Sequence, residues 1–401
     1  MSGPLDGVTV LDLSRVLTGP YCSMMLADMG AEVVKVERPD GGDDTRGWGP
    51  PWVGDESHYF LSVNRNKKSL TLNLKTEQGQ KIAHQLVKKA DVVLENFSPG
   101  TAERLGLDYD KVKELNSDIV YCSISGFGQD GPYRERPAYD LILQGMGGLM
   151  GVTGPEGEEP IRVGVAVADI GAGMYAAYAI AAALVERSES GQGQYIDVSM
   201  MDVQVSWMSY MAHYVFASGE IPVRRASGHP SIVPYQAFPT ADGWINVTVG
   251  NDSLWQRFAP LVDIDPCDSK FATNSDRIEH RDELIELISN EMETRTTDEW
   301  MRILDEAKVP CGPVYDLKQV LSDPQVEHRD MIQKMQHTSE GEIDVLGIPV
   351  KLSRTEGQLR TAPPLLGEHN ADILSDLGYK AQDIQELVNR GVITPPVQTE
   401  E

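Results

Sequence analysis

The alternation of strand-like and helix-like segments in the first third of the chain constrains its fold most. Residues 7–13 predict a strand, residues 20–29 predict a helix, and residues 32–37 predict a second strand. A helical crossover of this kind joins parallel strands. Further strands are expected at 69–74, 91–95 and 119–124, with helices at 77–89 and 109–115. The pattern predicts an α/β fold with an open, doubly wound (Rossmann-like) sheet.

The middle of the chain predicts a second, smaller domain. A Pro- and Gly-rich connector at 221–234 precedes an alternating segment that turns at Asp242-Gly243, a dipeptide typical of hairpins. Helical patterns follow up to about residue 307. The expected division is a large α/β domain over 1–220, a small α+β domain with linkers over 221–320, and a return segment over 321–401 whose helices pack on the large domain.

The chain is strongly acidic. It has 61 Asp and Glu against 35 Lys and Arg, a formal net charge of −26. Such a surface repels nucleic acid and anionic lipid, so we expect neither as a partner. The charge is compatible with an ordinary acidic protein or with adaptation to high salt, and we expect the halophilic adaptation.

Cysteine usage and apolar runs indicate a reduced compartment. Cys22, Cys122, Cys267 and Cys311 are widely separated, so neither a disulfide framework nor a zinc site is expected. The first residues do not resemble a signal peptide. The longest apolar run, 174–185, is too short to span a bilayer. We expect a cytoplasmic protein without a membrane segment.

Several common cofactor and catalytic motifs are missing from the sequence. The first turn after the opening strand, 14–20, lacks the G-x-G-x-x-G pattern of dinucleotide-binding folds. No H-E-x-x-H, P-loop or G-x-S-x-G pattern occurs elsewhere. We therefore expect no metal and no resident cofactor.

One carboxylate, Asp169, stands out by its surroundings. It follows an apolar, β-like run at 163–168 and precedes a helix of small residues at 174–185. Gly171 and Gly173 allow a substrate or another backbone to come close. The N-terminus of the helix favours the ionised form of the acid. Asp169 is therefore a candidate for chemistry, although a simple helix N-cap explains the same pattern.

Cations gather after the predicted strands of the large domain. Arg38, Lys75, Arg104 and Arg136 each lie at or just after the carboxyl end of a strand, where open α/β sheets bind ligands. Each of them alone is compatible with solvated surface. Together, in so acidic a chain, they indicate an anionic ligand.

A series of motifs resembles the class III CoA-transferases, the family of formyl-CoA transferase and carnitine-CoA transferase. The resemblance covers nearly the whole chain and occurs in one order. It is carried by residues 4–12, 30–38, 91–97, 126–132, 191–197, 309–313 and 362–369.

The resemblance implies an activity, a site and an assembly. Asp169 matches the nucleophilic aspartate of the family, and a CoA thioester is a substrate rather than a cofactor. The family forms an interlocked homodimer, with each active site between the large domain of one subunit and the small domain of the other. The matching CoA contact positions are Leu17, Thr18, Arg38, Leu72, Asn73, Leu74, Lys75, Asn96, Phe97, Ser98, Arg104, Arg136, Pro137, Ala138 and Tyr139.

Two departures from the family pattern narrow the expected reaction. The glycine-rich lid of the formyl-CoA transferases is not visible near 225–260, so oxalate and formate are not the expected acids. The related 2-methylacyl-CoA racemases carry a histidine where this chain has Tyr139. Racemisation needs a second acid–base group, and tyrosine is a poor one at neutral pH, so transfer is favoured over racemisation.

We therefore expect CoA transfer from succinyl-CoA to mesaconate or a similar C4–C5 dicarboxylate, through an aspartyl anhydride and an aspartyl-CoA thioester. A 2-methylacyl-CoA racemase and a non-catalytic acyl-CoA binder stay open as alternatives. Candidates for the substrate pocket are Arg15, Arg46, Trp48, His58, Tyr59 and Arg65.

Overall fold

A computed structural model describes residues 3–397 of the chain, so the first two and last four residues, including the end of the expected 321–401 segment, lie outside the description. The chain divides into two compact units. The large unit contains the residues up to Gly147, the stretch Gly164–Met208 and the residues from Pro324 onward. The small unit contains Gly148–Val163 and Ser209–Asp323.

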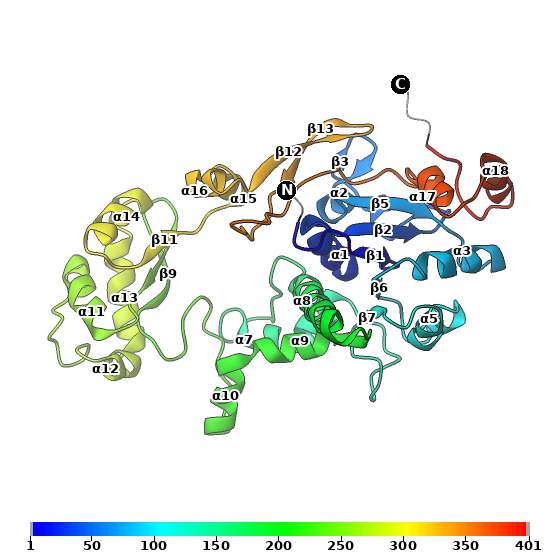
Figure 1. The fold of residues 1–401 in the computed structure, drawn as a ribbon. Coiled ribbons are helices and arrows are strands. Elements are labelled where there is room, and N and C mark those ends of the chain that lie inside the picture. Colours follow the sequence, from blue (N-terminus) through cyan, green and yellow to red (C-terminus); the bar gives the residue numbers. More distant parts are fainter. Residues whose placement is uncertain (1–2, 398–401) are drawn as a thin grey trace. The chain divides into compact units, whose positions relative to one another are not determined.

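A six-stranded parallel sheet organises the large unit (Figure 1). The order of its strands is β5-β2-β1-β6-β7-β8, and every neighbouring pair is parallel. The α/β class predicted from the sequence is thereby confirmed. The strands are β1 (Thr9–Asp12), β2 (Glu32–Glu37), β5 (Lys67–Thr71), β6 (Val92–Glu95), β7 (Val120–Ser125) and β8 (Tyr195–Ser199).

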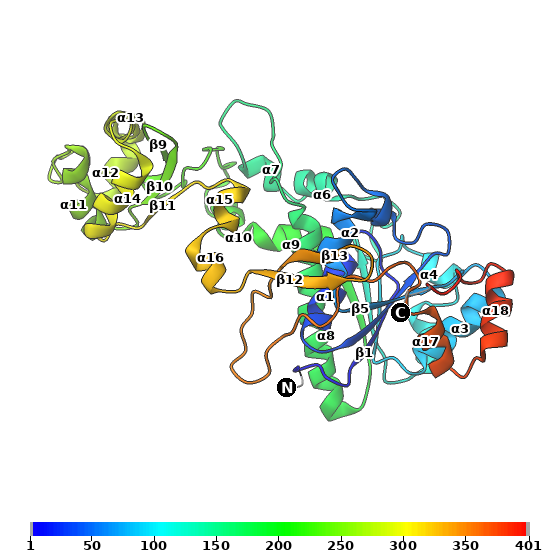
Figure 2. The same ribbon diagram turned by 90° about the horizontal axis from the view of Figure 1, so that it is seen from above.

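Helices cover both faces of this sheet and bury two separate apolar cores (Figures 1 and 2). On one side, Ile82 and Leu374 pack against strand residues such as Leu11. On the other, Ala172 and Ile180 pack beneath Val10 and its neighbours. The helices of the first side are α3 (Glu77–Val87), α5 (Tyr109–Leu115), α17 (Asn370–Asp376) and α18 (Ala381–Asn389); those of the second are α1 (Thr18–Asp28), α8 (Val167–Ser190) and α9 (Met200–Trp207).

The C-terminal part of the chain is fastened to β5 by hydrogen bonds. The Asn370 side-chain oxygen accepts the backbone N–H of Thr71 at 2.9 Å, and the Ser69 N–H donates to His369 at 3.2 Å. A hairpin precedes these helices in the sequence. Its strands are β12 (Ile332–His337) and β13 (Gly341–Leu346).

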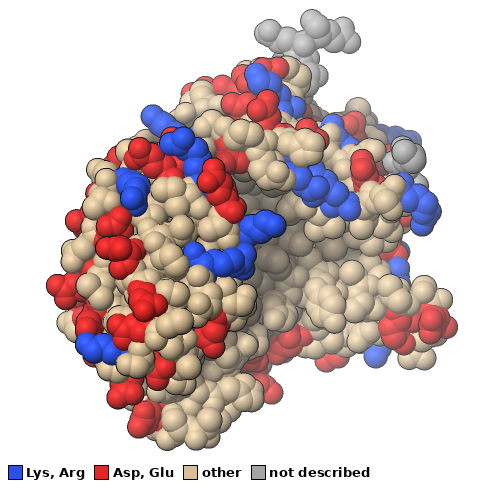
Figure 3. Space-filling model, turned by 90° about the vertical axis from the view of Figure 1, so that its left-hand side faces the viewer, with Lys and Arg blue, Asp and Glu red and all other residues tan. Residues whose placement is uncertain are grey.

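The small unit contains the predicted hairpin and a group of helices. Strand β9 (Tyr235–Pro239) pairs with β10 (Trp244–Thr248) around the turn, and β11 (Cys311–Pro313) completes an antiparallel sheet. Trp255, Trp300 and Phe258 are fully buried in its core. Figure 3 shows one face of the molecule, on which Asp and Glu are spread over the surface of this unit. The helices are α10 (Ser209–Ser218), α11 (Asp252–Phe258), α12 (Asn274–Glu279), α13 (Arg281–Met292), α14 (Thr297–Glu306), α15 (Leu317–Leu321) and the short α7 (Leu149–Val152).

Helix α8 differs from its prediction at both ends. It spans 24 residues, so the predicted β-like run at 163–168 is not a strand, and Val165 within it is 58% exposed. Only Val167 and Ala168 of this run belong to the helix, and residues 163–166 form an irregular segment before it. Among residues 3–397, α8 is the one helix long and apolar enough to cross a membrane by length and composition, which corrects the shorter run predicted. Core helices pass the same test, and half of that apolar window is buried.

Candidate active site

Asp169 is the third residue of α8, at the end of the helix that meets α1. The cap position is occupied by Ala166, whose side chain caps nothing, so Asp169 is not the N-cap. The hydroxyl of Thr18, the first residue of α1, donates a hydrogen bond to the Asp169 carboxylate. The two helix N-termini therefore meet at this carboxylate.

Both glycines after Asp169 serve the packing of α8. A Cβ on Gly173 would lie 2.7 Å from the carbonyl oxygen of Thr18, and a Cβ on Gly171 would lie 2.0 Å from the ring of Trp207. The predicted close approach of another backbone is confirmed at Gly173. Because Gly173 lets α1 come close, it also sets the position of Thr18 beside Asp169.

Burial raises the pKa of Asp169 to about 6, and the charge of Asp140 adds to the rise, while the hydrogen bond from Thr18 opposes it. The favourable effect of the helix N-terminus stays a prediction, and burial is the cause that dominates the pKa of Asp169. An acid with this pKa is mostly ionised at neutral pH, and a more basic carboxylate is a better nucleophile.

An apolar cluster surrounds the site of the carboxylate. Leu17 is buried, and Tyr59 and Ile170 pack against the same cluster. Burial and the charge of Asp169 raise the pKa of Tyr59 to about 12, so its hydroxyl keeps its proton. Trp48 meets the Tyr59 ring edge-on at 5.0 Å between centroids. These side chains limit the access of water to Asp169 from this side.

A buried ion pair supports the loop before Thr18. Val16 adopts a left-handed conformation, φ 69°, which is costly for a β-branched residue. Its N–H donates to both oxygens of Asp43 at 3.2 Å. Asp43 in turn pairs with the fully buried Lys35 at 2.8 Å. Burial raises the pKa of Asp43, but Lys35 and the hydrogen bonds from Thr45 outweigh it and hold the pKa at about 2.

Sequence reasoning missed this ion pair. The signal was Lys35, a charged residue between the apolar Val34 and Val36 of a buried strand.

A cavity of about 430 Å³ opens at the carboxyl ends of β1, β2, β5 and β6. It brings together residues from four separate segments, which is the ligand-binding edge expected of such a sheet. The side chains of Arg15 and Arg38 both contact Asp44 beside it. Of the predicted residues, those that line the cavity are Arg15, Arg38, Leu72, Asn73, Leu74, Lys75 and Phe97.

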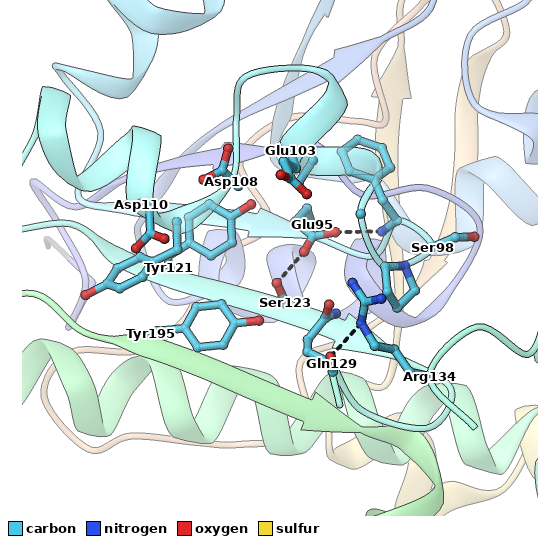
Figure 4. A pocket seen from close by; sticks show the side chains of 15 residues that line it. Glu95, Ser98, Glu103, Asp108, Asp110, Tyr121, Ser123, Gln129, Arg134 and Tyr195 are labelled. Carbon is cyan, nitrogen blue, oxygen red and sulfur yellow. Dashed lines mark hydrogen bonds between the residues drawn. The ribbon is translucent and has the colours of Figure 1, made fainter. Parts of the chain in front are cut away.

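The loop after β6 is held on both of its sides. The Asn96 side chain exchanges two hydrogen bonds with the backbone of Arg15, at 2.9 and 2.8 Å. The Phe97 N–H donates to Glu95 at 2.7 Å. Figure 4 shows Glu95 on the floor of a second cavity, bonded also to Ser123, with Ser98 at the rim. Burial raises the pKa of Glu95 to about 7.

Other predicted CoA positions do not line the 430 Å³ cavity. Arg104, in α4 (Thr101–Arg104), donates to the Thr101 hydroxyl at 2.7 Å. Arg136 lies over the ring of Tyr133 at 4.8 Å. Tyr139 precedes α6 (Asp140–Met146) and is 68% exposed. Leu17, Thr18, Ser98, Pro137 and Ala138 also lie outside the residues that line that cavity.

Two of the predicted substrate arginines are engaged elsewhere. Arg46 forms two hydrogen bonds to the buried Glu37, at 2.7 and 2.8 Å. Arg65 does the same with Asp28, at 3.0 and 2.7 Å. Because both guanidinium groups are buried with their counter-ions, the expectation that they hold a substrate carboxylate is not supported. Sequence cannot distinguish such arginines, since no local pattern shows that Glu37 and Asp28 become their partners in the folded chain.

Of the remaining candidates, Trp48 lies in the loop after β2, His58 and Tyr59 begin the helix that follows this loop, and Arg15 comes after β1. This loop includes a 3₁₀ turn (Asp44–Gly47), β3 (Trp52–Val53) and β4 (Glu56–Ser57), and leads into α2 (His58–Val63). His58 Nδ1 lies 2.8 Å from the carbonyl oxygen of Pro51. Arg15 lines the cavity, is partly exposed, and forms an ion pair with Asp44 at 3.5 Å.

Comparison with known proteins identifies the family. Residues 5–370 match CoA-transferase family III, and the chain belongs to this family of CoA-transferases. Human succinyl-CoA:glutarate CoA-transferase is 43% identical over 393 residues, which cover 97% of this chain and 90% of the relative. Succinyl-CoA:mesaconate CoA-transferase of Haloarcula marismortui is 38% identical, covering 94% and 97%.

A solved CAIB/BAIF family protein from Brucella suis has a similar fold. Its TM-score is 0.86 and its sequence identity is 39%, with 94% of this chain and all of that chain covered. The family resemblance seen in the sequence is thereby confirmed.

Proposed function

We propose that the enzyme transfers CoA from succinyl-CoA to a dicarboxylic acid through covalent intermediates on Asp169. The observation that carries this proposal is the pairing of a half-shielded, unusually basic carboxylate with an anion-accepting cavity in the same unit. Relatives named for succinyl-CoA transfer to glutarate, mesaconate and D-citramalate support the choice of donor and of acceptor class.

The reaction proceeds by four acyl exchanges. The Asp169 carboxylate attacks the thioester carbonyl of succinyl-CoA and expels CoA thiolate, which leaves an aspartyl–succinyl anhydride. The thiolate attacks the aspartyl carbonyl, forms an aspartyl-CoA thioester and releases succinate. The acceptor carboxylate then attacks that thioester and expels CoA thiolate again. The thiolate finally attacks the acceptor carbonyl, which yields the new acyl-CoA and returns Asp169 as carboxylate.

The residues around Asp169 have separate tasks in this scheme. The Thr18 hydroxyl orients the Asp169 carboxylate. While the anhydride forms, it can donate its hydrogen bond to the oxygen on which negative charge develops. Leu17, Tyr59 and Ile170 keep water from the anhydride, which would otherwise hydrolyse. Arg38 and Lys75, beside the cavity, bind phosphate groups of CoA.

We further propose that a second copy of the chain completes the site, as in an interlocked homodimer. Helix α8 leaves Tyr178 and Val185 73% and 66% exposed, and α10 leaves Phe216 78% exposed. Large aromatic and aliphatic side chains exposed on one helix indicate a surface that a partner covers.

An exchange assay tests the function. The enzyme is incubated with succinyl-CoA and, separately, glutarate, mesaconate, citramalate or oxalate, and new acyl-CoA is measured by mass spectrometry. Transfer to at least one of glutarate, mesaconate and citramalate is expected, and transfer to oxalate is not. Incorporation of deuterium at the α-carbon of a 2-methylacyl-CoA without an acceptor would indicate a racemase instead. Saturable binding of succinyl-CoA without any exchange would leave only a binding protein.

A further inference from the structure

Asp140, the first residue of α6, reaches across to the beginning of α8. Its side chain is buried, and its Oδ1 accepts the backbone N–H of Ala168 at 2.9 Å. Its Oδ2 accepts a hydrogen bond from the Gln144 amide at 2.7 Å, one turn further along α6. Both oxygens are thus fixed by donors from two different helices.

The contact to Ala168 replaces a missing cap. The first N–H groups of an α-helix lack partners within the helix. Ala166, at the cap position of α8, has no side-chain oxygen to offer. Asp140 provides that oxygen from outside the helix, and the N–H that it binds belongs to the residue directly before Asp169.

We propose that Asp140 is a positioning residue for the transfer reaction: it fixes the backbone of the first turn of α8, which aims the Asp169 carboxylate, and keeps a negative charge beside it. This inference rests on the proposed function of Asp169. Asp140 touches no substrate in this scheme. It acts through the helix that carries the nucleophile.

The surroundings of Asp169 support the proposal that Asp140 keeps a negative charge beside it. The groups that face it from the packed elements are Thr18 of α1, Tyr59 of α2 and Asp140 of α6. Of these three, Asp140 is the one whose charge raises the pKa of Asp169, whereas the Thr18 hydroxyl lowers it. Burial is the main reason that the pKa of Asp169 is raised, and Asp140 adds to it. A buried neighbouring charge is poorly screened, so the effect persists in salt.

If Asp140 only capped α8 and did not position Asp169, its replacement would have a different effect. A lost cap lowers the stability of the whole protein and leaves the chemistry of the folded fraction unchanged. A positioning residue changes the rate per folded molecule, because the carboxylate misses the thioester carbonyl. The two roles are separated by rates measured on folded protein.

The test uses two variants at Asp140 and two matched controls. Asp140→Ala removes the acceptor and the charge. Asp140→Asn keeps an oxygen for the Ala168 N–H and removes only the charge, with Gln144 turning its amide. Asp108→Ala and Asp108→Asn make the same changes at the cap of α5, where Asp108 accepts the Lys111 N–H at 3.2 Å. Single-turnover formation of a hydroxamate at Asp169, from succinyl-CoA and hydroxylamine, is followed by mass spectrometry across pH.

Asp140→Ala is expected to slow hydroxamate formation by about 10²-fold per folded molecule, as misplacement of a reacting group does. Asp140→Asn is expected to recover most of that rate, with the acid limb of its pH profile moved to lower pH. Both Asp108 variants are expected to match the wild type in rate. If Asp140→Ala does not fold, the Asp140→Asn profile decides.

A wild-type rate in folded Asp140→Ala, or an acid limb unmoved in Asp140→Asn, would overturn the proposal. Absence of hydroxamate in the wild type would instead overturn the proposed function of Asp169.

Discussion

Replacing the nucleophile should stabilise the folded protein. Asp169→Asn removes a carboxylate whose pKa rises from 3.8 to about 6 on folding, chiefly because of burial. The folded state therefore holds the proton more tightly than the unfolded chain does. Ionised Asp169 destabilises the folded state fully above pH 6, and this destabilisation disappears as the pH falls towards 3.8.

The magnitude follows from the same values. Each pKa unit corresponds to about 1.4 kcal/mol, so the ionised carboxylate costs at most about 3 kcal/mol at pH 7.5. At pH 5 about half of that cost remains. The asparagine variant keeps an oxygen that accepts the Thr18 hydroxyl, so the two proteins differ mainly in charge.

Urea unfolding of the wild type and Asp169→Asn at pH 7.5 and pH 5 measures both quantities. We expect a more stable variant at pH 7.5 and a gain about half as large at pH 5. Asp108→Asn, on the opposite face of the sheet, is the control and should show no such pattern. A variant no more stable than the wild type at pH 7.5, or a gain that grows towards pH 5, would refute the reasoning.

Three other predictions follow from the packing and the charge. Gly173→Ala should slow CoA exchange at least tenfold, because its Cβ would strike the Thr18 carbonyl, whereas Gly151→Ala, which meets no neighbour, should exchange at the wild-type rate. Asp43→Ala leaves Lys35 buried without its counter-ion and should lower the free energy of unfolding by about 3–5 kcal/mol, and an unchanged urea midpoint would contradict this. Because the net charge is −26, the melting temperature should rise between 0.1 and 2 M KCl on the order of several degrees, and a flat response would argue against salt adaptation.

The strands of the large unit were predictable because their signal is local. Runs such as 92–94 are apolar on both faces, and the helices between them have regular spacing, so the class of the sheet follows from the sequence. The hairpin at Asp242-Gly243 was predictable for the same reason. The N-terminus of α8 was not, because its cap comes from Asp140, which lies 28 residues earlier in the chain.

The site itself was predictable only in part. Residues 72–75 follow a strand of the sheet, so their meeting with Arg38 at one edge follows from topology. In the sequence, Arg46 and Arg65 were candidates to bind a substrate carboxylate. In the structure, each forms an ion pair with a buried carboxylate of the protein. Which acid each arginine meets is decided by how β2 and the loops around it pack, and no local pattern marks the pairing.

In the proposed function, Asp169 carries first the acyl group and then CoA. In the proposed scheme one oxygen of the acceptor carboxylate remains on Asp169 when the new acyl-CoA departs. After turnover with succinyl-CoA and ¹⁸O-labelled glutarate, mass spectrometry of the peptide that contains Asp169 should show ¹⁸O in its side chain. Turnover that leaves this side chain unlabelled would contradict the account.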